Sequence, residues 1–430
     1  MQNTPMQPVA QESVKTKQRL VLAAILLFTV MVAYFDRVNI SVLVVDNEFL
    51  SDMGIKGQPV QIGMLMTGFL IAYGLGNLTL SSLGDYIGPR KTMCIAMVLW
   101  GFSMFWGGIA QFFTMMLISR FVLGLGEGMH FPMQSTFVKK WFPRQERARA
   151  NACWFIGTSL APALAMPVFV WIVSHMGWRS SFFICAVVGL LPLYLIWFHT
   201  ADTPRQHKKV NALELQYIEA GLTEDGGVKN TAVHASVGEN IKTVAGNYRF
   251  WLLVIYYAAH NFVYWGLLTW LPTYLKTARG FSWKEMGFLA SLPFILSIIC
   301  KVIAGVASDY VGRRAPFCVI ATLGSAIGIY FTGKVVDNYS AAALICFGMG
   351  VLTLGAPMVF TMLQELLPDR AISLGTGTMN GLSFFFASLG PVMIGFFIGL
   401  TGGFAGALYL LVGMSLIGMT SALILALQKY

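Results

Sequence analysis

The chain has 430 residues, of which 56% are hydrophobic and only 11% are charged, and its mean hydropathy is +0.67. Soluble domains carry about 25% charged residues and disorder requires low hydrophobicity, so both classes are excluded for most of the chain. The net charge is +10, and most of the basic residues lie in loops between the apolar runs. This distribution indicates membrane topology rather than nucleic-acid binding. Long apolar runs, rather than the ~10-residue alternation of barrel strands, predict an all-α integral membrane protein.

Apolar runs long enough to cross a bilayer, about 20 residues each, predict twelve transmembrane helices. The expected spans are 20–45, 61–82, 92–112, 114–138, 149–174, 181–199, 250–276, 285–308, 316–336, 340–364, 374–400 and 404–428. They divide the chain into a cytoplasmic N-terminal tail, a six-helix bundle, a cytoplasmic central loop and a second six-helix bundle, with the boundaries 1–19, 20–199, 200–249 and 250–430.

The distribution of basic residues predicts the orientation in the membrane. One set of loops, which includes both termini and the central loop, holds 20 of the 29 Lys and Arg residues. By the positive-inside rule these loops and both termini are cytoplasmic, in a multi-pass protein of the cell inner membrane. The six cysteines lie in or beside apolar runs without paired spacing, so we interpret them as buried hydrophobic residues rather than disulfides or metal ligands.

An internal repeat relates the two halves of the chain. Asp85 and Asp309 each begin an Asp-Tyr-Ile/Val-Gly segment followed by basic residues, at the turn between the second and third spans of a half. Parallel halves of six spans with a substrate path between them are one known transporter plan. We expect Asp85, Arg90, Asp309 and Arg313 to form gating contacts on the cytoplasmic side; the alternative is a plain basic loop that only sets topology.

Charged residues inside the spans are the main candidates for function. Asp36 and Arg37 lie in the first span, where each charge costs roughly 2.5–3.5 kcal/mol on insertion scales. Arg120 and Glu127 lie two turns apart on one face of the fourth span, about 10 Å along its axis, and the glycines at 124, 126 and 128 allow close helix packing. The alternatives are a structural ion pair for Asp36 and Arg37, and an interfacial position for Arg120.

Such a residue set can couple protons to an anion. A carboxyl in a cavity of low polarity favours its neutral form, and an adjacent guanidinium favours the ionised form. An anion that competes for the guanidinium therefore links its own binding to protonation. His130, three residues after Glu127, could hydrogen-bond that carboxylate or could be a packed interior polar group. Lys301, inside the eighth span, either extends to the membrane edge or adds a positive charge to the transport path.

The repeated loop resembles the cytoplasmic signature of the major facilitator superfamily, Gly-x-x-x-Asp-x-x-Gly-basic-basic. The second copy fits fully, whereas the first has Ser81 for the leading Gly and Tyr86 for the usual Arg. Segments 34–39, 120–132, 141–147 and 268–275 are similar to the anion:cation symporter family. That family includes bacterial galactonate, glucarate and hexuronate transporters as well as animal sialin and vesicular glutamate transporters. The resemblance covers residues 20–428.

The resemblance implies the major facilitator fold and roles for four charged residues. In the family, the acidic residues of the first and fourth spans carry protons, which implies Asp36 and Glu127, and the arginines recognise the anion or gate the path, which implies Arg37 and Arg120. The remaining candidates for contact with a sugar acid carry aromatic, amide or hydroxyl groups: Tyr34, Tyr73, Asn261, Asn380 and Ser383. His260 is a further candidate, for tuning the site. Thr158 stands where sugar-acid relatives often carry Gln, which leaves the substrate open.

No nucleophile, metal-ligand or nucleotide-binding pattern occurs in the sequence, so we expect neither an enzyme nor a cofactor or metal. We expect a monomeric secondary transporter that imports an organic anion, preferably an aldonate, aldarate or hexuronate, by proton symport through alternating access. Its partners would be a small anion, protons and the lipid bilayer. The alternatives are transport of another mono- or dicarboxylate, anion exchange, and a membrane sensor that does not transport.

Overall fold

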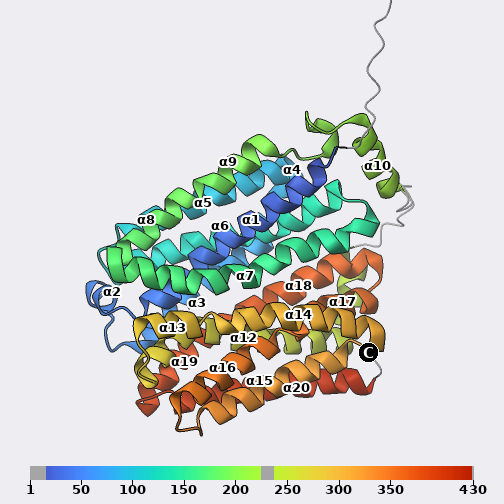
Figure 1. Cartoon of the computed structure of the whole chain (residues 1–430). Coiled ribbons are helices and arrows are strands. Elements are labelled where there is room, and N and C mark those ends of the chain that lie inside the picture. The colour runs from blue at the N-terminus through green and yellow to red at the C-terminus, as the bar shows by residue number, and fades with distance from the viewer. Residues whose placement is uncertain (1–15, 224–236, 429–430) are drawn as a thin grey trace, which may run out of the picture.

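The computed structural model describes residues 16–223 and 237–428, and its regular elements are helices (Figure 1). The first half holds α1 Gln18–Leu43, α2 Asn47–Asp52, α3 Pro59–Leu75, η1 Gly76–Leu80, α4 Leu83–Ile87, α5 Pro89–Gly108, α6 Phe113–Trp141, α7 Arg144–Met176, α8 Trp178–Val188 and α9 Leu190–His199. The central part holds η2 Pro204–Gln206, α10 Ala212–Thr223 and α11 Val237–Ala245. The second half holds α12 Tyr248–Thr273, η3 Tyr274–Ala278, α13 Trp283–Leu289, α14 Leu292–Val311, α15 Ala315–Thr332, α16 Asn338–Leu352, α17 Gly355–Leu366, α18 Asp369–Ala387, α19 Leu389–Thr401 and α20 Ala405–Leu427.

Each of the twelve expected spans is a helix or a pair of consecutive helices. Ten of these segments, within the described ranges, are long and apolar enough to cross a membrane. The other two expected spans are α5 and α6, which are less apolar because α6 carries Arg120, Glu127 and His130 and α5 begins with Arg90 and Lys91. The chain is therefore an all-α, multi-pass membrane protein, as the sequence predicts.

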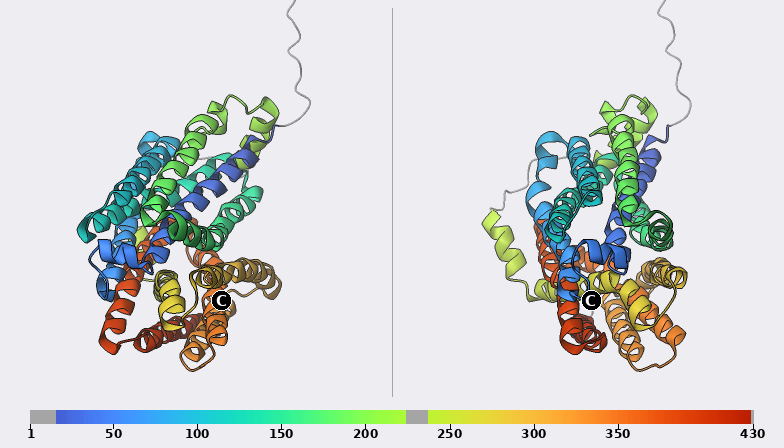
Figure 2. Two further views of the ribbon diagram at one scale, coloured as in Figure 1. Left: turned by 60° about the vertical axis from the view of Figure 1, so that its left-hand side comes forward. Right: turned by 90° about the vertical axis from the view of Figure 1, so that its left-hand side faces the viewer.

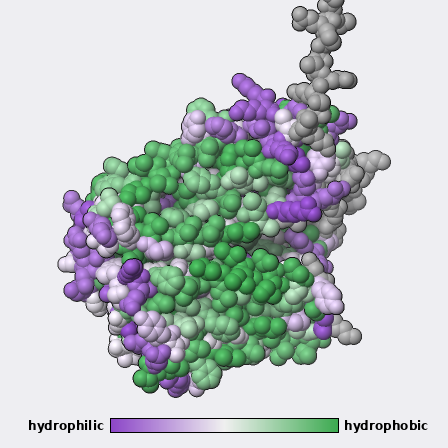
Figure 3. All heavy atoms as spheres, viewed as in Figure 1, coloured by the Kyte–Doolittle hydropathy of each residue, from purple (hydrophilic) through white to green (hydrophobic). Residues whose placement is uncertain are grey.

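The membrane helices form two bundles that lie against each other. In the first, α6 packs between α3 and α5, and α1 packs on α7; in the second, α15 packs between α16 and α20, and α12 between α18 and α20. Figure 1 shows the blue-to-green bundle beside the yellow-to-red bundle, and Figure 2 shows the same separation from two further sides. On the face of the molecule seen in Figure 3, apolar side chains cover both bundles, and polar side chains gather at the two ends.

The two bundles approach each other most closely near the end of the molecule that carries α2, which we call the α2 end. A Cβ atom added to Gly63 in α3 would lie 2.8 Å from the Cα of Val392 in α19, and the Thr67 hydroxyl donates to the Ser388 carbonyl at 2.6 Å. At the same end Arg179 donates to Asp52 at 2.6 Å. This hydrogen bond lowers the pKa of the Asp52 carboxyl and holds α2 to the start of α8.

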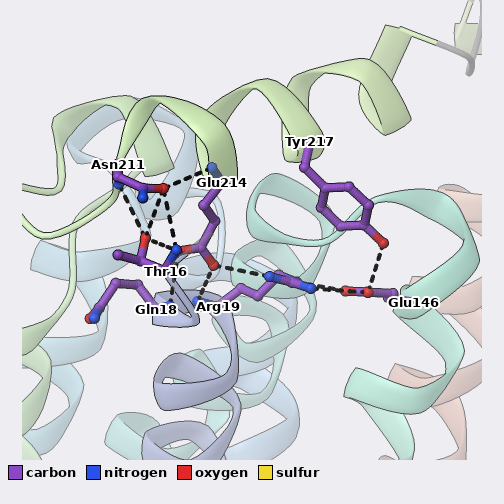
Figure 4. A network of polar contacts seen from close by, with 7 residues as sticks. All are labelled: Thr16, Gln18, Arg19, Glu146, Asn211, Glu214 and Tyr217. Atoms are coloured by element: carbon purple, nitrogen blue, oxygen red, sulfur yellow. Dashed lines mark hydrogen bonds and ion pairs between the residues drawn. The ribbon is translucent and has the colours of Figure 1, made fainter. Parts of the chain in front are cut away.

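The opposite end carries α10, which is bound to the first bundle through Glu214 (Figure 4). The Glu214 side chain is fully buried. Its carboxylate accepts hydrogen bonds from the Thr16 hydroxyl at 2.5 Å, from the backbone N–H groups of Gln18 and Arg19 at 3.0 and 3.2 Å, and from the Arg19 guanidinium at 3.1 Å. Lys17, at the N-cap of α1, makes no side-chain cap. Glu214 therefore satisfies the first N–H groups of the first membrane helix.

Arg19 extends this network to α7. Its guanidinium donates to both oxygens of Glu146, at 2.8 and 3.2 Å, and the Tyr217 hydroxyl of α10 donates to the same carboxylate at 2.9 Å. Figure 4 shows the carboxylates of Glu214 and Glu146 on either side of the Arg19 guanidinium. The start of α1, the start of α7 and α10 are thus joined by charge-assisted hydrogen bonds.

We expect the change Glu214→Ala to destabilise the protein by about 1–3 kcal/mol, because it leaves partly buried donors, including the Arg19 guanidinium, without their acceptor. The midpoint of thermal unfolding in detergent should fall measurably. The matched control is Glu219→Gln, which breaks an exposed pair with Arg205 and should change stability by less than about 1 kcal/mol. Equal midpoints for the two variants would contradict a capping role for Glu214.

Candidate functional site

The centre of the candidate site is an ion pair between Arg37 of α1 and Glu127 of α6. The Arg37 Nε donates to the Glu127 Oε2, and the side chains are 1% and 0% exposed. Breaking a buried pair by removing one partner costs about 3–5 kcal/mol, because the other charge stays buried. Arg37, which the sequence predicts to bind the anion, is thus paired with Glu127, which the sequence predicts to carry a proton. Of the alternatives drawn from the sequence, a structural ion pair of Arg37 with Asp36 is not what the structure shows, because Arg37 pairs with Glu127.

Aromatic rings surround the Arg37 guanidinium. They come from α1, α3, α6 and α12, and the distances from the Arg37 Cζ to the ring centroids are 4.5 Å to Tyr34, 4.9 Å to Tyr73, 5.4 Å to Phe131, 5.5 Å to Phe69 and 5.7 Å to Trp265. A guanidinium near an aromatic face gains roughly 0.5–2 kcal/mol per favourable contact when desolvated. Trp265 belongs to the second bundle, so both bundles contribute to the surroundings of this cation.

Asp36 and Arg120 form a second polar group beside the pair. The Arg120 Nη1 donates to the backbone carbonyl of Asp36 at 3.3 Å. The Asp36 carboxyl lies against the Cys185 thiol, and none of the described nitrogen or hydroxyl donors hydrogen-bonds to its oxygens. Within the same described part of the chain, the Nε and Nη2 of Arg120 and the Nη2 of Arg37 are also buried without partners. Unsatisfied buried polar atoms are uncommon, and this group can bind an anion and protons.

Glycines place α6 close enough to α3 for these contacts. A Cβ on Gly128 would lie 2.5 Å from the Tyr73 carbonyl oxygen, and one on Gly124 would collide with the Phe69 carbonyl oxygen. On the other side of α6, a Cβ on Gly126 would lie 2.9 Å from the Ala96 carbonyl oxygen in α5. The predicted close helix packing is confirmed, and it brings Glu127 next to the aromatic face of α3.

Of the two alternatives that the sequence leaves open for His130, the structure shows the packed interior polar group, with contacts to Thr29 and Gln134 rather than Glu127. The His130 Nε2 lies 3.1 Å from the Thr29 hydroxyl and 3.1 Å from the Gln134 amide nitrogen, and Nδ1 has no partner. The ring is fully buried. The next helical turn supplies Gln134 and the neighbouring helix supplies Thr29, so His130 belongs to a separate polar contact between α1 and α6.

The second bundle supplies a polar and aromatic face from α12 and α18. His260 is 4% exposed and stacks between Tyr257 and Tyr264, with centroid distances of 6.0 and 6.5 Å. Asn261 and Ser383 are buried; Asn261 lies against the Tyr257 hydroxyl, and the Ser383 hydroxyl has no partner among the described residues. Next to Ser383, Phe384 packs on Tyr73 at 4.7 Å and on Trp265 at 6.0 Å. Asn380 is half-buried one turn before Phe384.

Lys301 of α14 contacts the first bundle rather than the membrane edge. Its Nζ donates to the Thr158 hydroxyl at 3.1 Å and to the Ser159 hydroxyl at 2.7 Å. Both hydroxyls belong to α7, which packs against α14. Of the two positions considered from the sequence, the structure shows the one directed into the protein.

The arginines of the two repeated loops each contact the half of the chain to which they belong, and the predicted gating contacts of these loops stay a prediction. The Arg90 backbone N–H donates to Asp202 at 2.9 Å, and its guanidinium donates to the Trp197 carbonyl. The Arg313 guanidinium donates to the Ala426 carbonyl at 2.6 Å. Each arginine therefore ties its loop to the last span of its own half. The side chains of Asp85 and Asp309 lie outside the described residues.

Sequence reasoning missed several neighbours of the central pair. Phe69 lies one turn before Tyr73 and Phe131 one turn after Glu127, so helical periodicity could have placed both on the faces that carry the site. Cys185 gave no signal, because a buried thiol has the same sequence pattern as a small hydrophobic residue. Among the described residues, no group of three or more His, Cys, Asp and Glu is placed to hold a metal ion.

The model of the Major Facilitator Superfamily matches residues 26–391 and 284–429. The chain belongs to this superfamily. Its fold agrees: a bacterial homologue of the human lysosomal transporter Spinster, solved in an inward-facing and unoccupied conformation, superposes with a TM-score of 0.71 at 15% identity, over 97% of this chain and 96% of that one. The predicted fold class is confirmed.

Curated relatives extend over nearly the whole chain. A probable galactarate/D-glucarate transporter of Bacillus subtilis is 28% identical over 96% of this chain and 92% of its own length. A probable sulfoacetate transporter of Cupriavidus necator is 28% identical over 91% of this chain and 90% of its own length. The resemblance to bacterial sugar-acid transporters is therefore confirmed. The family and these relatives are transporters, not enzymes.

We expect Gly128→Leu to separate α6 from α3 and to destabilise the protein by about 1–3 kcal/mol, because the new side chain meets backbone atoms. The thermal midpoint in detergent should fall. Gly101→Ala in α5 is the control, since no atom lies within 4 Å of its added Cβ and alanine favours a helix. A Gly128→Leu protein as stable as the wild type would contradict the close packing.

Proposed function

We propose that this transporter imports an organic anion of the sugar-acid class, an aldonate, aldarate or hexuronate, by proton symport through alternating access. The observation that carries the proposal is the buried Arg37–Glu127 pair, enclosed by aromatic rings from both bundles. A guanidinium is suited to bind a carboxylate with two hydrogen bonds. The galactarate/D-glucarate relative supports this substrate class.

Proton coupling follows from competition for Arg37. While Glu127 is ionised, it occupies the Nε of Arg37. A proton on Glu127 removes that charge and frees the guanidinium for the carboxylate of the substrate. Conversely, an anion bound to Arg37 leaves the Glu127 carboxylate without its cation. Protonation of Glu127 then costs less free energy than keeping an unpaired carboxylate buried. Anion and proton binding therefore favour each other by the same free energy.

Asp36 and Arg120 supply a second exchange site of the same kind. Asp36 has no hydrogen-bond donor from nitrogen or hydroxyl groups, so it is suited to accept a proton. Arg120 has free donors in the same interior. We assign proton coupling to Asp36 and Glu127 and anion binding to Arg37 and Arg120.

The hydroxyls and carbon edges of a sugar acid fit the rest of the site. Rings pack on apolar edges, while amides and hydroxyls bond to alcohol groups. Tyr34 and Tyr73 already lie at Arg37. From the second bundle we add the buried Asn261 and Ser383, and Asn380 one turn before Phe384. His260 would tune this face through its stacking between two tyrosines.

Alternating access would require separation of the bundles at the α2 end. We place that end outside the cell and both termini in the cytoplasm of the inner membrane, because basic residues concentrate in the loops near the termini. The contacts of α3 with α19 would then form the outer closure. The repeated loops, with Asp85, Arg90, Asp309 and Arg313, would serve the inner one. The transporter would act as a monomer.

A second candidate substrate is a small sulfonate or other carboxylate. The sulfoacetate relative favours it, since that relative and the sugar-acid relative are both 28% identical to this chain. The same cations bind sulfonates and carboxylates. Exchange of anions without net proton movement would be the corresponding alternative mechanism.

We expect vesicles with the wild-type protein to accumulate one sugar acid when an inward proton gradient is imposed, and to reach only equilibrium without it. In Glu127→Gln the accumulation should disappear while exchange of labelled for unlabelled acid continues, because the amide cannot carry a proton. A panel of labelled aldonates, aldarates, hexuronates and sulfoacetate identifies the substrate. Accumulation that ignores the gradient, or survives in the variant, would refute the coupling assignment.

Arg37→Lys should lower the ratio kcat/KM for uptake by about tenfold or more, because an ammonium loses the planar donor fork and part of the aromatic contact. The control is Arg179→Lys, since that arginine pairs with Asp52 at the α2 end. Uptake by the control should match the wild type. If both variants transported equally well, anion binding would have to be assigned elsewhere.

A further inference from the structure

Lys301 is a second cationic centre, distinct from the Arg37–Glu127 pair. It lies within α14, and its ammonium reaches across to α7 of the other bundle, where it donates to Thr158 at 3.1 Å and Ser159 at 2.7 Å. The Ser159 hydroxyl also shares a hydrogen bond of 2.9 Å with Ser297 of α14. The three hydroxyls come from both bundles and form a compact polar group in an otherwise apolar contact between α7 and α14.

This ammonium has no carboxylate partner. Across residues 16–223 and 237–428, no Asp or Glu oxygen whose position is described lies within 4.0 Å of its Nζ, whereas Arg37 is paired with Glu127. Hydroxyls orient the ammonium without neutralising it. A cation at membrane depth is costly unless it is paired or serves a path for ions or substrates. The geometry therefore leaves Lys301 available to an anionic group from outside the chain.

One face of α12 connects the two cationic centres. His260 lies within electrostatic range of the Lys301 ammonium, and its buried Nδ1 has no partner among the described residues. One turn later Tyr264 stacks on His260 and contacts Trp265, at centroid distances of 6.5 and 5.5 Å. Trp265 in turn faces Arg37 at 5.7 Å. The unpartnered histidine and the uncompensated ammonium thus lie at the other end of the aromatic series that encloses the central pair.

We propose that Lys301, with the hydroxyls of Thr158 and Ser159, binds a second acidic group of the substrate while Arg37 binds the first. The site then selects dianions, such as six-carbon aldarates, over the matching aldonates, which have a neutral alcohol at that position. An ammonium and adjacent hydroxyls are suitable donors for a carboxylate. This inference rests on the proposed function, because it assumes that Arg37 receives one carboxylate.

The test compares two acids that differ only at one end of the carbon chain, galactarate and galactonate, in reconstituted vesicles. The wild type should transport galactarate with the higher kcat/KM. Lys301→Met should lower kcat/KM for galactarate by about tenfold or more, because a charge-assisted contact is lost, and should change that for galactonate by less than about threefold. Lys301→Arg, which keeps the charge, should retain the preference for galactarate.

Thr158→Val provides an independent variant, since it removes one hydroxyl and keeps the ammonium. It should reduce the preference for galactarate over galactonate even if Lys301→Met fails to fold. An equal loss of kcat/KM for both acids in Lys301→Met and in Thr158→Val would show that this contact only holds the two bundles together. That result would overturn the proposal. Transport of galactonate with no preference for galactarate would overturn the proposed role of Lys301 but leave the sugar-acid function in place. Transport of no aldonate, aldarate or hexuronate in the labelled panel would overturn the sugar-acid function as well.

Discussion

The structure depends on keeping one ion pair in an interior where isolated charges are strongly disfavoured. Removing Arg37 and Glu127 from water costs several kcal/mol per ion, and only close geometry and further contacts offset it. Each neighbouring feature supplies part of that compensation. Aromatic rings surround the guanidinium, and glycines on α6 let the backbone of this helix approach α3. The pair is therefore stable enough to persist, yet each ion depends on the other.

Trp265 makes this local balance a property of the whole molecule. The other four rings around Arg37 belong to the first bundle, whereas Trp265 comes from α12 of the second. A displacement of one bundle relative to the other consequently changes the surroundings of the cation. In the same way, the ammonium of Lys301 meets hydroxyls across the bundle contact. Ionic state and bundle arrangement are thus physically linked in two places rather than one.

Much of the fold followed from simple constraints, and the exact partners did not. Bilayer thickness sets the length of apolar runs, so the spans were readable, and the cost of burying charge pointed to Asp36, Arg37, Arg120 and Glu127. Which carboxylate meets which guanidinium depends on helix rotation and packing, which no local pattern encodes. His130 shows this limit: its spacing from Glu127 was right for contact, but Thr29 on another helix gave a better partner. Lys301 shows it again, since its hydroxyl partners lie 142 and 143 residues away in the chain.

The cap that Glu214 places on α1 also determines how the two bundles are joined along the chain. Hydrogen bonds hold α10 to the first bundle, and α11 packs on α18 and α12 of the second. In the sequence, only residues 224–236 connect α10 to α11. A chain of that length spans at most about 50 Å when fully extended. The central loop, although fifty residues long in the sequence, thus limits bundle movement as a much shorter tether does.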